Sequence, residues 1–184
     1  MDSIRTNRTR RQRGYNFERE LVNRINSCNG WRALRLGSPS VSLPDVIAVN
    51  NEESIMLAIE AKSTSTDTIR IPLEQIERCL RWLDTFSLYK HRYAILALKF
   101  MSKKWKKAYT YKYRELHEYY KLWDGLTNIS SNGSSKSSIA SILLCKYDGS
   151  IYYIGYSNSG NDRNSYGTKT IQLELKEFKM PFDP

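Results

Sequence analysis

The sequence predicts a mixed α/β protein, with a central mixed β-sheet flanked by helices and a small β-rich C-terminal extension. Two observations support this fold class. Between residues 14 and 124, segments with helical apolar periodicity alternate with short apolar segments typical of strands. Beyond a serine-rich stretch at 127–138, only strand patterns follow. The length of 184 residues fits one domain with an appendage. We expect a basic flexible arm at 1–13, the main domain at 14–124, and at 125–184 a linker and hairpin packed on the same domain.

A helix is expected directly after the basic arm. Phe17, Leu21, Ile25 and Cys28 are spaced so that they share one helical face. Asn29-Gly30 is a typical stop signal for such a helix.

Three strands are expected next. The segments WRALRLG at 31–37, LPDVIAV at 43–49 and ESIMLAIEAKS at 53–63 are short and apolar. In the third segment, the period of two places Glu60 and Lys62 on the same face of the strand. Charged side chains in apolar strands call for an explanation.

The second half of the main domain contains two more helical patterns. After a polar loop, Pro72 opens an amphipathic helix, because proline suits the first helical turn. The remaining elements are expected in this order: a buried strand RYAILALKF at 92–100, its partner strand WKKAYTYKY at 105–113, a second amphipathic helix RELHEYYKLW at 114–123, a hairpin at 139–157 with its turn at 147–150, and a strand TIQLELKEF at 170–178.

Positive charge is concentrated in two blocks. The formal net charge is +10, and residues 1–124 carry 23 Lys and Arg against 14 Asp and Glu. Residues 1–13 contain five arginines, and residues 99–112 contain six lysines interleaved with aromatic side chains. A basic surface of this kind attracts polyanions, because each neutralised phosphate releases counterions. Nucleic acid is the expected partner; the alternative is a solvated, solubilising face.

Cysteine and histidine usage narrows the chemistry. The three cysteines, Cys28, Cys79 and Cys145, are odd in number and far apart, which indicates buried thiols in a reducing cytoplasm. Only two histidines are present, which argues against HNH and zinc sites. No apolar run is long enough to predict a membrane span. The arginine-rich N-terminal segment has no apolar signal core, although its composition leaves a transit peptide open.

Asp45, Glu60 and Lys62 form a candidate catalytic constellation. Asp45 and Glu60 come from adjacent strands, and two carboxylates at short range usually share a divalent cation. Mg²⁺ would then be held by Asp45, Glu60 and the carbonyl of Ala61, and Mn²⁺ is expected to substitute. Lys62 would orient the attacking water or stabilise negative charge in the transition state. This arrangement suits hydrolysis of phosphodiesters.

Glu18 is the fourth candidate. It lies in line with Val22 and Ile25 on the first helix, beside the apolar stripe. A carboxylate there could reach a metal held on the sheet, or it could be an exposed charge that favours the helix dipole. Glu60 and Lys62 could likewise be an ordinary ion pair on an exposed face.

The motif "PD…EAK" resembles the signature of the PD-(D/E)XK nucleases and, more narrowly, the archaeal Holliday junction resolvases. The resemblance covers about residues 11–112 and follows an ordered series of matches. These are Gly14, Glu18-Arg19, Gly30-Trp31, Arg35, Gly37-Ser38, LPDVIAV, AIEAKS, Glu74-Gln75 and ILALKF.

The resemblance implies a restriction-endonuclease-like core, and it indicates which residues bind the metal, which take part in catalysis and which contact DNA. Glu18, Asp45 and Glu60 would be the acidic metal ligands, with Lys62 and Ser38 also in the catalytic site. The resemblance further implies a homodimer that cuts four-way DNA junctions symmetrically in recombination and repair, because two sites at fixed separation recognise the shape of a junction. DNA contacts are expected from Arg11, Arg13, Arg19, Arg35, Lys103, Lys104, Lys106 and Lys107.

Three alternatives stay open at this point. The chain could be another endonuclease with the same core, of the restriction or repair type, acting on duplex or flapped DNA. It could be a DNA-binding protein with an inactive nuclease fold, or a basic adaptor without chemistry. A cytoplasmic, nucleoid-associated location without membrane contact is expected, and a replication or repair protein as further partner is left open.

Overall fold

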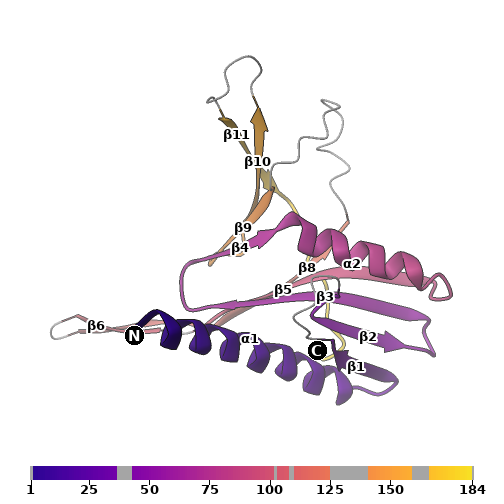
Figure 1. The fold of residues 1–184 in the computed structure, drawn as a ribbon. Coiled ribbons are helices and arrows are strands. Elements are labelled where there is room, and N and C mark those ends of the chain that lie inside the picture. Colours follow the sequence, from indigo (N-terminus) through magenta and orange to yellow (C-terminus); the bar gives the residue numbers. More distant parts are fainter. Residues whose placement is uncertain are drawn as a thin grey trace.

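The computed structural model describes residues 2–36, 43–101, 103–107, 110–124, 141–158 and 166–183. The serine-rich stretch at 127–138 lies outside these residues. A five-stranded main sheet has α1 on one side and α2 on the other (Figure 1). This arrangement confirms the predicted mixed α/β class with a central mixed sheet flanked by helices.

The main sheet has the order β1-β2-β3-β5-β8. Only the central pair, β3 and β5, is parallel; the other neighbours are antiparallel. The strands are β1 (Trp31–Arg35), β2 (Val46–Asn50), β3 (Ile55–Thr64), β5 (His91–Phe100) and β8 (His117–Trp123). The predicted strands at 31–37, 43–49, 53–63 and 92–100 are therefore confirmed in type and position.

Helix α1 runs without interruption from Asp2 to Asn26. Residues 2–13, which the sequence analysis treats as a basic arm, form the first half of this helix. Arginine is a good helix former. Extending a helix whose second half is already packed also costs less than nucleating a new one. The side chain of Arg13 then reaches across and donates to Ser65 Oγ at 2.8 Å, just beyond β3.

Both faces of the main sheet are buried. α2 (Leu73–Thr85) packs with Ile76, Cys79 and Leu83 inward, opposite Met56 and Ala58 of β3. The predicted alternation of β3 is confirmed, because its other set of residues faces α1. The cluster on the α1 side contains Phe17, Leu21 and Ile25 of α1 with Leu57, Ile59, Ala61, Ile95 and Ala97 of the sheet.

The helix expected at 114–123 is wrong, because His117–Trp123 forms strand β8 against β5. Tyr120 packs in the cluster on the α1 side, whereas Trp123 packs in the cluster on the α2 side. β8 thus packs against apolar clusters on both faces and shows no simple alternation of apolar and polar residues. The spacing of Leu116, Tyr120 and Trp123 fits a helical face by coincidence.

The segment 105–113 does not pair with β5 as expected. Instead β6 (Lys103–Lys107) and β7 (Thr110–Arg114) pair with each other in a separate two-stranded sheet. Figure 1 shows β6 and the first turns of α1 at the same end of the molecule. Two segments that the sequence marks as basic therefore lie at the same end.

A second, four-stranded sheet has the order β11-β10-β9-β4. Its strands are β4 (Thr68–Pro72), β9 (Ile142–Lys146), β10 (Ile151–Asn158) and β11 (Tyr166–Leu173). The predicted hairpin of β9 and β10 is confirmed, and its turn places Gly149 at φ +84°, a conformation that favours glycine. β4 was expected as a polar loop, so this strand corrects the prediction.

Residues 174–183, here called the C-terminal strap, return to the main sheet. β11 ends at Leu173, which shortens the strand expected at 170–178. Leu122 N then donates to Lys176 O at 2.9 Å, and Phe178 N donates to Tyr120 O at 2.7 Å. The strap thereby pairs with the outer edge of β8. Within the described ranges, no helix has the length and apolar character needed to cross a bilayer.

Candidate metal centre and nucleic-acid interface

The antiparallel pairing of β2 and β3 builds the centre of the candidate site. Val46 pairs with Ile59, so Asp45, one residue before β2, comes next to Glu60 on β3. The carbonyl of Asp45 accepts a hydrogen bond from Leu36 N at 3.0 Å, which ties this residue to the end of β1. Lys62 lies two residues after Glu60 on the same face of β3, as predicted.

Three of the predicted side chains converge in one hydrogen-bonded network. Asp45 Oδ2 accepts from Ala61 N at 2.9 Å and from Lys62 Nζ at 3.1 Å. The same ammonium donates to Glu60 Oε1 at 2.5 Å. The carboxylate just before β2 and the carboxylate on β3 therefore share the ammonium of Lys62, and the structure brings Asp45, Glu60 and Lys62 together as expected.

Glu60 is the most deeply buried charged group of this network, with 0% of the residue exposed. Burial raises the pKa of its carboxyl, while the neighbouring ammonium of Lys62 opposes that rise and the charge of Asp45 adds to it. For Lys62, burial works against the charged form, but the two carboxylates outweigh burial and raise the pKa of the ammonium. Lys62 is therefore a cation at neutral pH.

Arg78 of α2 is a member of the network that the sequence did not predict. Its Nη2 donates to Glu60 Oε2 at 2.9 Å, and only 9% of the side chain is exposed. The apolar stripe of α2 predicted that the helix faces the sheet, but not which polar side chain enters the interface. The one sequence feature that pointed to an additional cation was Glu60 itself, because a carboxylate in an otherwise apolar strand needs partners for both of its oxygens.

The structure does not bring Glu18 into this network. Its carboxylate is buried on α1 and accepts from Arg35 Nε at 2.6 Å. The guanidinium of Arg35 also lies over the ring of Tyr15, 4.5 Å from the centroid. Glu18 is thus paired with Arg35, which is also one of the residues that resemble the resolvase pattern. The place of Glu18 among the metal ligands stays a prediction.

The donor set fits a hard divalent cation with few protein ligands. Across the described ranges, no three His, Cys, Asp or Glu side chains form a ready-made metal cluster. Asp45 and Glu60 nevertheless both point carboxylate oxygens toward the ammonium of Lys62. Mg²⁺ commonly binds through one or two carboxylates and keeps several waters, so these two side chains suit it. The carbonyl of Ala61 as a third ligand also stays a prediction.

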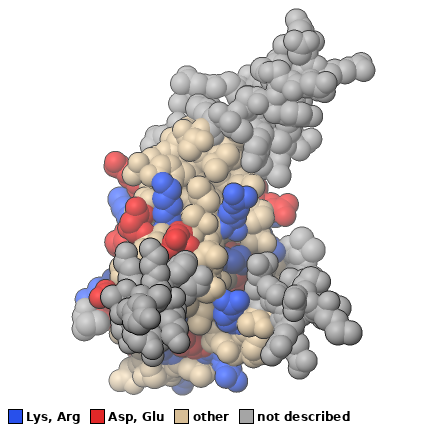
Figure 2. Space-filling model, turned by 90° about the vertical axis from the view of Figure 1, so that its left-hand side faces the viewer, with Lys and Arg blue, Asp and Glu red and all other residues tan. Residues whose placement is uncertain are grey.

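The expected DNA-binding residues are only partly described. Arg11 and Arg19 are exposed on α1, and Arg13 is held by Ser65 beside the end of β3. Figure 2 views the end of the molecule where α1 begins, and Lys and Arg side chains form a column through the middle of this face. Outside the description lie Ser38 and the side chains of Lys103, Lys104, Lys106 and Lys107.

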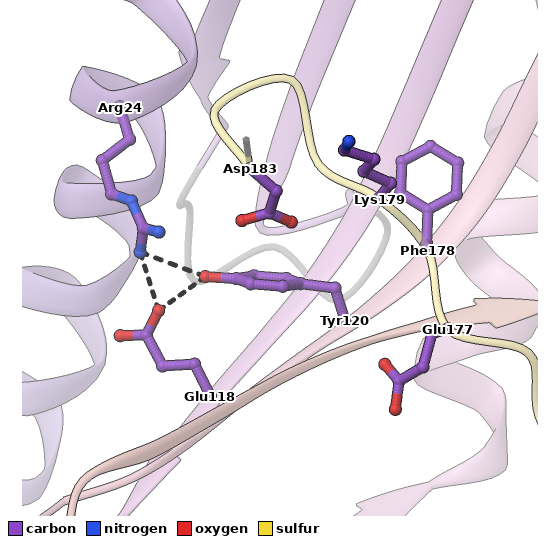
Figure 3. Close-up of a pocket in the computed structure, with 7 residues that line it drawn as sticks. All are labelled: Arg24, Glu118, Tyr120, Glu177, Phe178, Lys179 and Asp183. Atoms are coloured by element: carbon purple, nitrogen blue, oxygen red, sulfur yellow. Dashed lines mark hydrogen bonds and ion pairs between the residues drawn. The ribbon is translucent and has the colours of Figure 1, made fainter.

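A separate pocket of about 480 Å³ lies between α1, β8 and the C-terminal strap. Figure 3 shows Arg24, Glu118 and Tyr120 bonded to one another in it, with Arg24 Nη1 2.7 Å from Glu118 Oε2. Lys99 contacts the other oxygen of Glu118 at 2.9 Å. None of the three residues at the β2–β3 centre lines this pocket. Arg24 and Glu118 pair with each other across it, and Glu177 pairs with Lys121.

The hydrogen bonds of Glu118 in this pocket should make the stability of the protein depend on pH in the acid range. Burial alone would raise the pKa of Glu118, but hydrogen bonds from Lys99, Tyr120 and Arg24 outweigh burial and hold this pKa below its usual 4.5. Its stabilising contribution is present above the unfolded pKa and lost as pH falls through the folded pKa. Glu118→Gln should therefore flatten the fall in the free energy of unfolding between about pH 5 and pH 3, measured by urea unfolding. Exposed Glu52 is the control: if Glu52→Gln flattens the curve equally, the effect is not specific to Glu118.

Comparison with known proteins identifies relatives for the larger part of the chain. The family model of the archaeal Holliday junction resolvase (Hjc) matches residues 9–123. The crossover junction endodeoxyribonuclease Hje of Sulfolobus acidocaldarius is 34% identical over 97 residues, which cover 50% of this chain and 66% of that protein. Hje of Saccharolobus islandicus is 32% identical over 90 residues, which cover 47% of this chain and 63% of that protein.

Two further similarities extend this set. A crossover junction endodeoxyribonuclease of Sulfolobus islandicus rod-shaped virus 1 is 34% identical over 80 residues, which cover 42% of this chain and 64% of that protein. The chain thus spans 63–66% of the length of these three relatives. The solved structure of Hjc from Archaeoglobus fulgidus, a Holliday junction resolvase, aligns with a TM-score of 0.40 at 23% identity, covering 55% of this chain and 75% of that one. Because the family model matches more than half of the chain, the chain belongs to the archaeal Holliday junction resolvase (Hjc) family.

Proposed function

We propose that this chain is a metal-dependent endonuclease that hydrolyses phosphodiesters in four-way DNA junctions. The observation that carries the proposal is the convergence of Asp45 and Glu60 on the ammonium of Lys62, at the seam between β2 and β3. The relatives are named crossover junction endodeoxyribonucleases, which indicates the same class of reaction and substrate.

Asp45, Glu60 and the carbonyl of Ala61 would hold the metal, with Glu18 contributing directly or through water. When bound, Mg²⁺ or Mn²⁺ would supply a more acidic water and polarise the phosphate. Lys62 stays charged in its partly buried position, so its ammonium can orient water or face negative charge on the phosphate. Ser38, which follows β1 in the sequence, would complete the site.

DNA would approach the end of the molecule where the basic segments meet. The first half of α1 carries Arg11 and Arg13, and β6 lies at the same end of the molecule (Figure 1). Arg19 and Arg35 would contact phosphates near the site, and the lysines at 103, 104, 106 and 107 would contact a neighbouring duplex arm. Recognition by backbone and shape suits this set, because lysine and arginine bind phosphate without reading sequence.

A homodimer completes the proposal. Two copies related by a twofold axis would place two sites at a fixed separation and cut two strands of a junction symmetrically. This activity would serve DNA recombination and repair in the cytoplasm, in association with the nucleoid.

The test is cleavage of matched DNA substrates that share one sequence. A four-way junction, a linear duplex and a flap should be incubated with the protein and Mg²⁺, with Mn²⁺, and with EDTA. We expect paired cuts in the junction only, with either metal, and none with EDTA. Preferred cutting of duplex or flap would instead indicate a restriction-type or repair-type nuclease. Junction binding without cutting under every metal condition would indicate a non-catalytic binding protein.

The salt dependence of junction binding tests the basic face. The double substitution Arg11→Gln and Arg19→Gln removes two exposed cations from α1. Affinity decreases as salt rises, so the slope of log affinity against log salt is negative. If both arginines contact phosphate, the double variant should make this slope less steep by about 1.8, since each contact contributes about 0.9. Lys179, exposed on the strap, is the control, and Lys179→Gln should leave the slope unchanged. A slope that the double variant leaves at its original value would exclude phosphate contacts by this pair.

A further inference from the structure

Arg78 is a buried cation on α2. The residue is only 8% exposed, although arginine is almost never buried without a partner. Its Nη2 lies 2.9 Å from Glu60 Oε2, and Glu60 itself has no exposed surface. A buried ion pair is weak evidence for stability, because desolvation of both groups offsets much of their attraction. The pairing therefore calls for a role beyond holding α2 on the sheet.

The two oxygens of Glu60 are held by cations from different elements. Oε1 accepts from Lys62 on the same strand, and Oε2 accepts from Arg78 on the helix that covers this face. The last side-chain torsion of a glutamate is broad, so one hydrogen bond leaves the plane of the carboxylate free to turn. Contacts at both oxygens, from two separate backbone supports, fix that plane.

The Lys62 contact alone does not fix Glu60, because Lys62 divides its ammonium between two carboxylates. It lies 3.1 Å from Asp45 Oδ2 as well as 2.5 Å from Glu60 Oε1. An ammonium is a compact charge on a flexible stem, whereas guanidinium donors have fixed directions. Arg78 is therefore the more rigid of the two supports.

We propose that Arg78 is a positioning residue for the metal centre: by holding Glu60 Oε2, it keeps Glu60 Oε1 turned toward Asp45 and Lys62. This inference rests on the proposed function, because it assigns Glu60 to a metal. Groups that orient metal-binding carboxylates typically change metal affinity by about 10- to 100-fold when they are removed.

The test compares Arg78→Gln and Arg78→Lys with Arg81→Gln, a control at an exposed arginine of the same helix. Mn²⁺ alone is titrated into each protein by calorimetry, and the Mg²⁺ concentration for half-maximal junction cleavage is measured separately. We expect Arg78→Gln to weaken Mn²⁺ binding by at least about tenfold and to raise the Mg²⁺ requirement similarly. Arg78→Lys should recover part of the loss, and Arg81→Gln should match the original protein. Junction binding in EDTA should be unchanged in all variants.

A purely structural role would lower the melting temperature of both Arg78 variants but leave Mn²⁺ affinity in the folded protein unchanged, and that result would overturn the proposal. If Arg78→Gln does not fold, Arg78→Lys decides: Mn²⁺ affinity equal to that of Arg81→Gln would refute positioning by the guanidinium fork. Failure of the original protein to cut any junction would instead refute the proposed function. The Mn²⁺ titration is independent of cutting, so the two failures are distinguishable.

Discussion

Replacing Asp45 by Asn, or Glu60 by Gln, is expected to abolish metal-dependent cleavage of a four-way junction. Each change keeps the shape of the side chain and removes one negative charge from the pair that shares Lys62. A metal contributes several kcal/mol to stabilising charge in such reactions, so losing a ligand should slow cleavage by about 10³-fold or more. The measurement is the single-turnover rate at saturating protein and Mg²⁺.

Junction affinity in EDTA should survive both changes, because the basic face remains intact. Glu52→Gln, in the exposed turn between β2 and β3, is the matched control and should cut at the original rate. Cleavage by either site variant at the original rate would show that the reaction takes place elsewhere on the molecule.

Lys62→Ala should lose turnover but keep metal affinity. Its ammonium is positive at neutral pH and lies within hydrogen-bond distance of both candidate ligands. Removing one preorganised electrostatic group typically costs about 10²- to 10³-fold in the rate of the chemical step. We therefore expect a loss of this size in the single-turnover rate, with an unchanged Mg²⁺ requirement.

Lys90→Ala, at an exposed position before β5, controls for loss of a lysine in general. If Lys62→Ala instead needs far more Mg²⁺ and recovers full speed at high concentration, Lys62 serves to hold the carboxylates. The assignment to the chemical step would then be wrong.

The centre of the candidate site could be predicted because it depends on local patterns. β2 and β3 are adjacent in the chain, and their alternation specifies which side chains share a face. Asp45, Glu60 and Lys62 then meet through one antiparallel pairing. Arg78 reaches the same place from α2, and the offset of a helix over a sheet depends on tertiary packing that no periodicity encodes.

The elements that the sequence did not predict were missed for different physical reasons. β8 packs against apolar clusters on both faces, so its residues lack the period of two that identifies a half-buried strand. β4 is short, ends in Pro72, and pairs with β9, which is distant in the chain. Such long-range pairing leaves little local signal. The first half of α1 failed for the opposite reason: it is helical by continuation, without an apolar stripe of its own.

The sequence indicated three buried thiols, and the structure confirms this for Cys79 and Cys145, whereas the free thiol of Cys28 is only half-buried. Cys79 and Cys145 are buried, and burial raises the pKa of Cys79 and, to about 12, that of Cys145. Cys28 is half-buried and follows the last turn of α1, at the far end of this helix from β6 (Figure 1).

Thiolates are nucleophiles that add to maleimide reagents, so the half-buried Cys28 is the preferred attachment point for a fluorophore on this chain. A dye on Cys28 would lie away from the end where DNA is expected to approach. Energy transfer from that dye to labelled junction arms could then follow binding without any engineered cysteine.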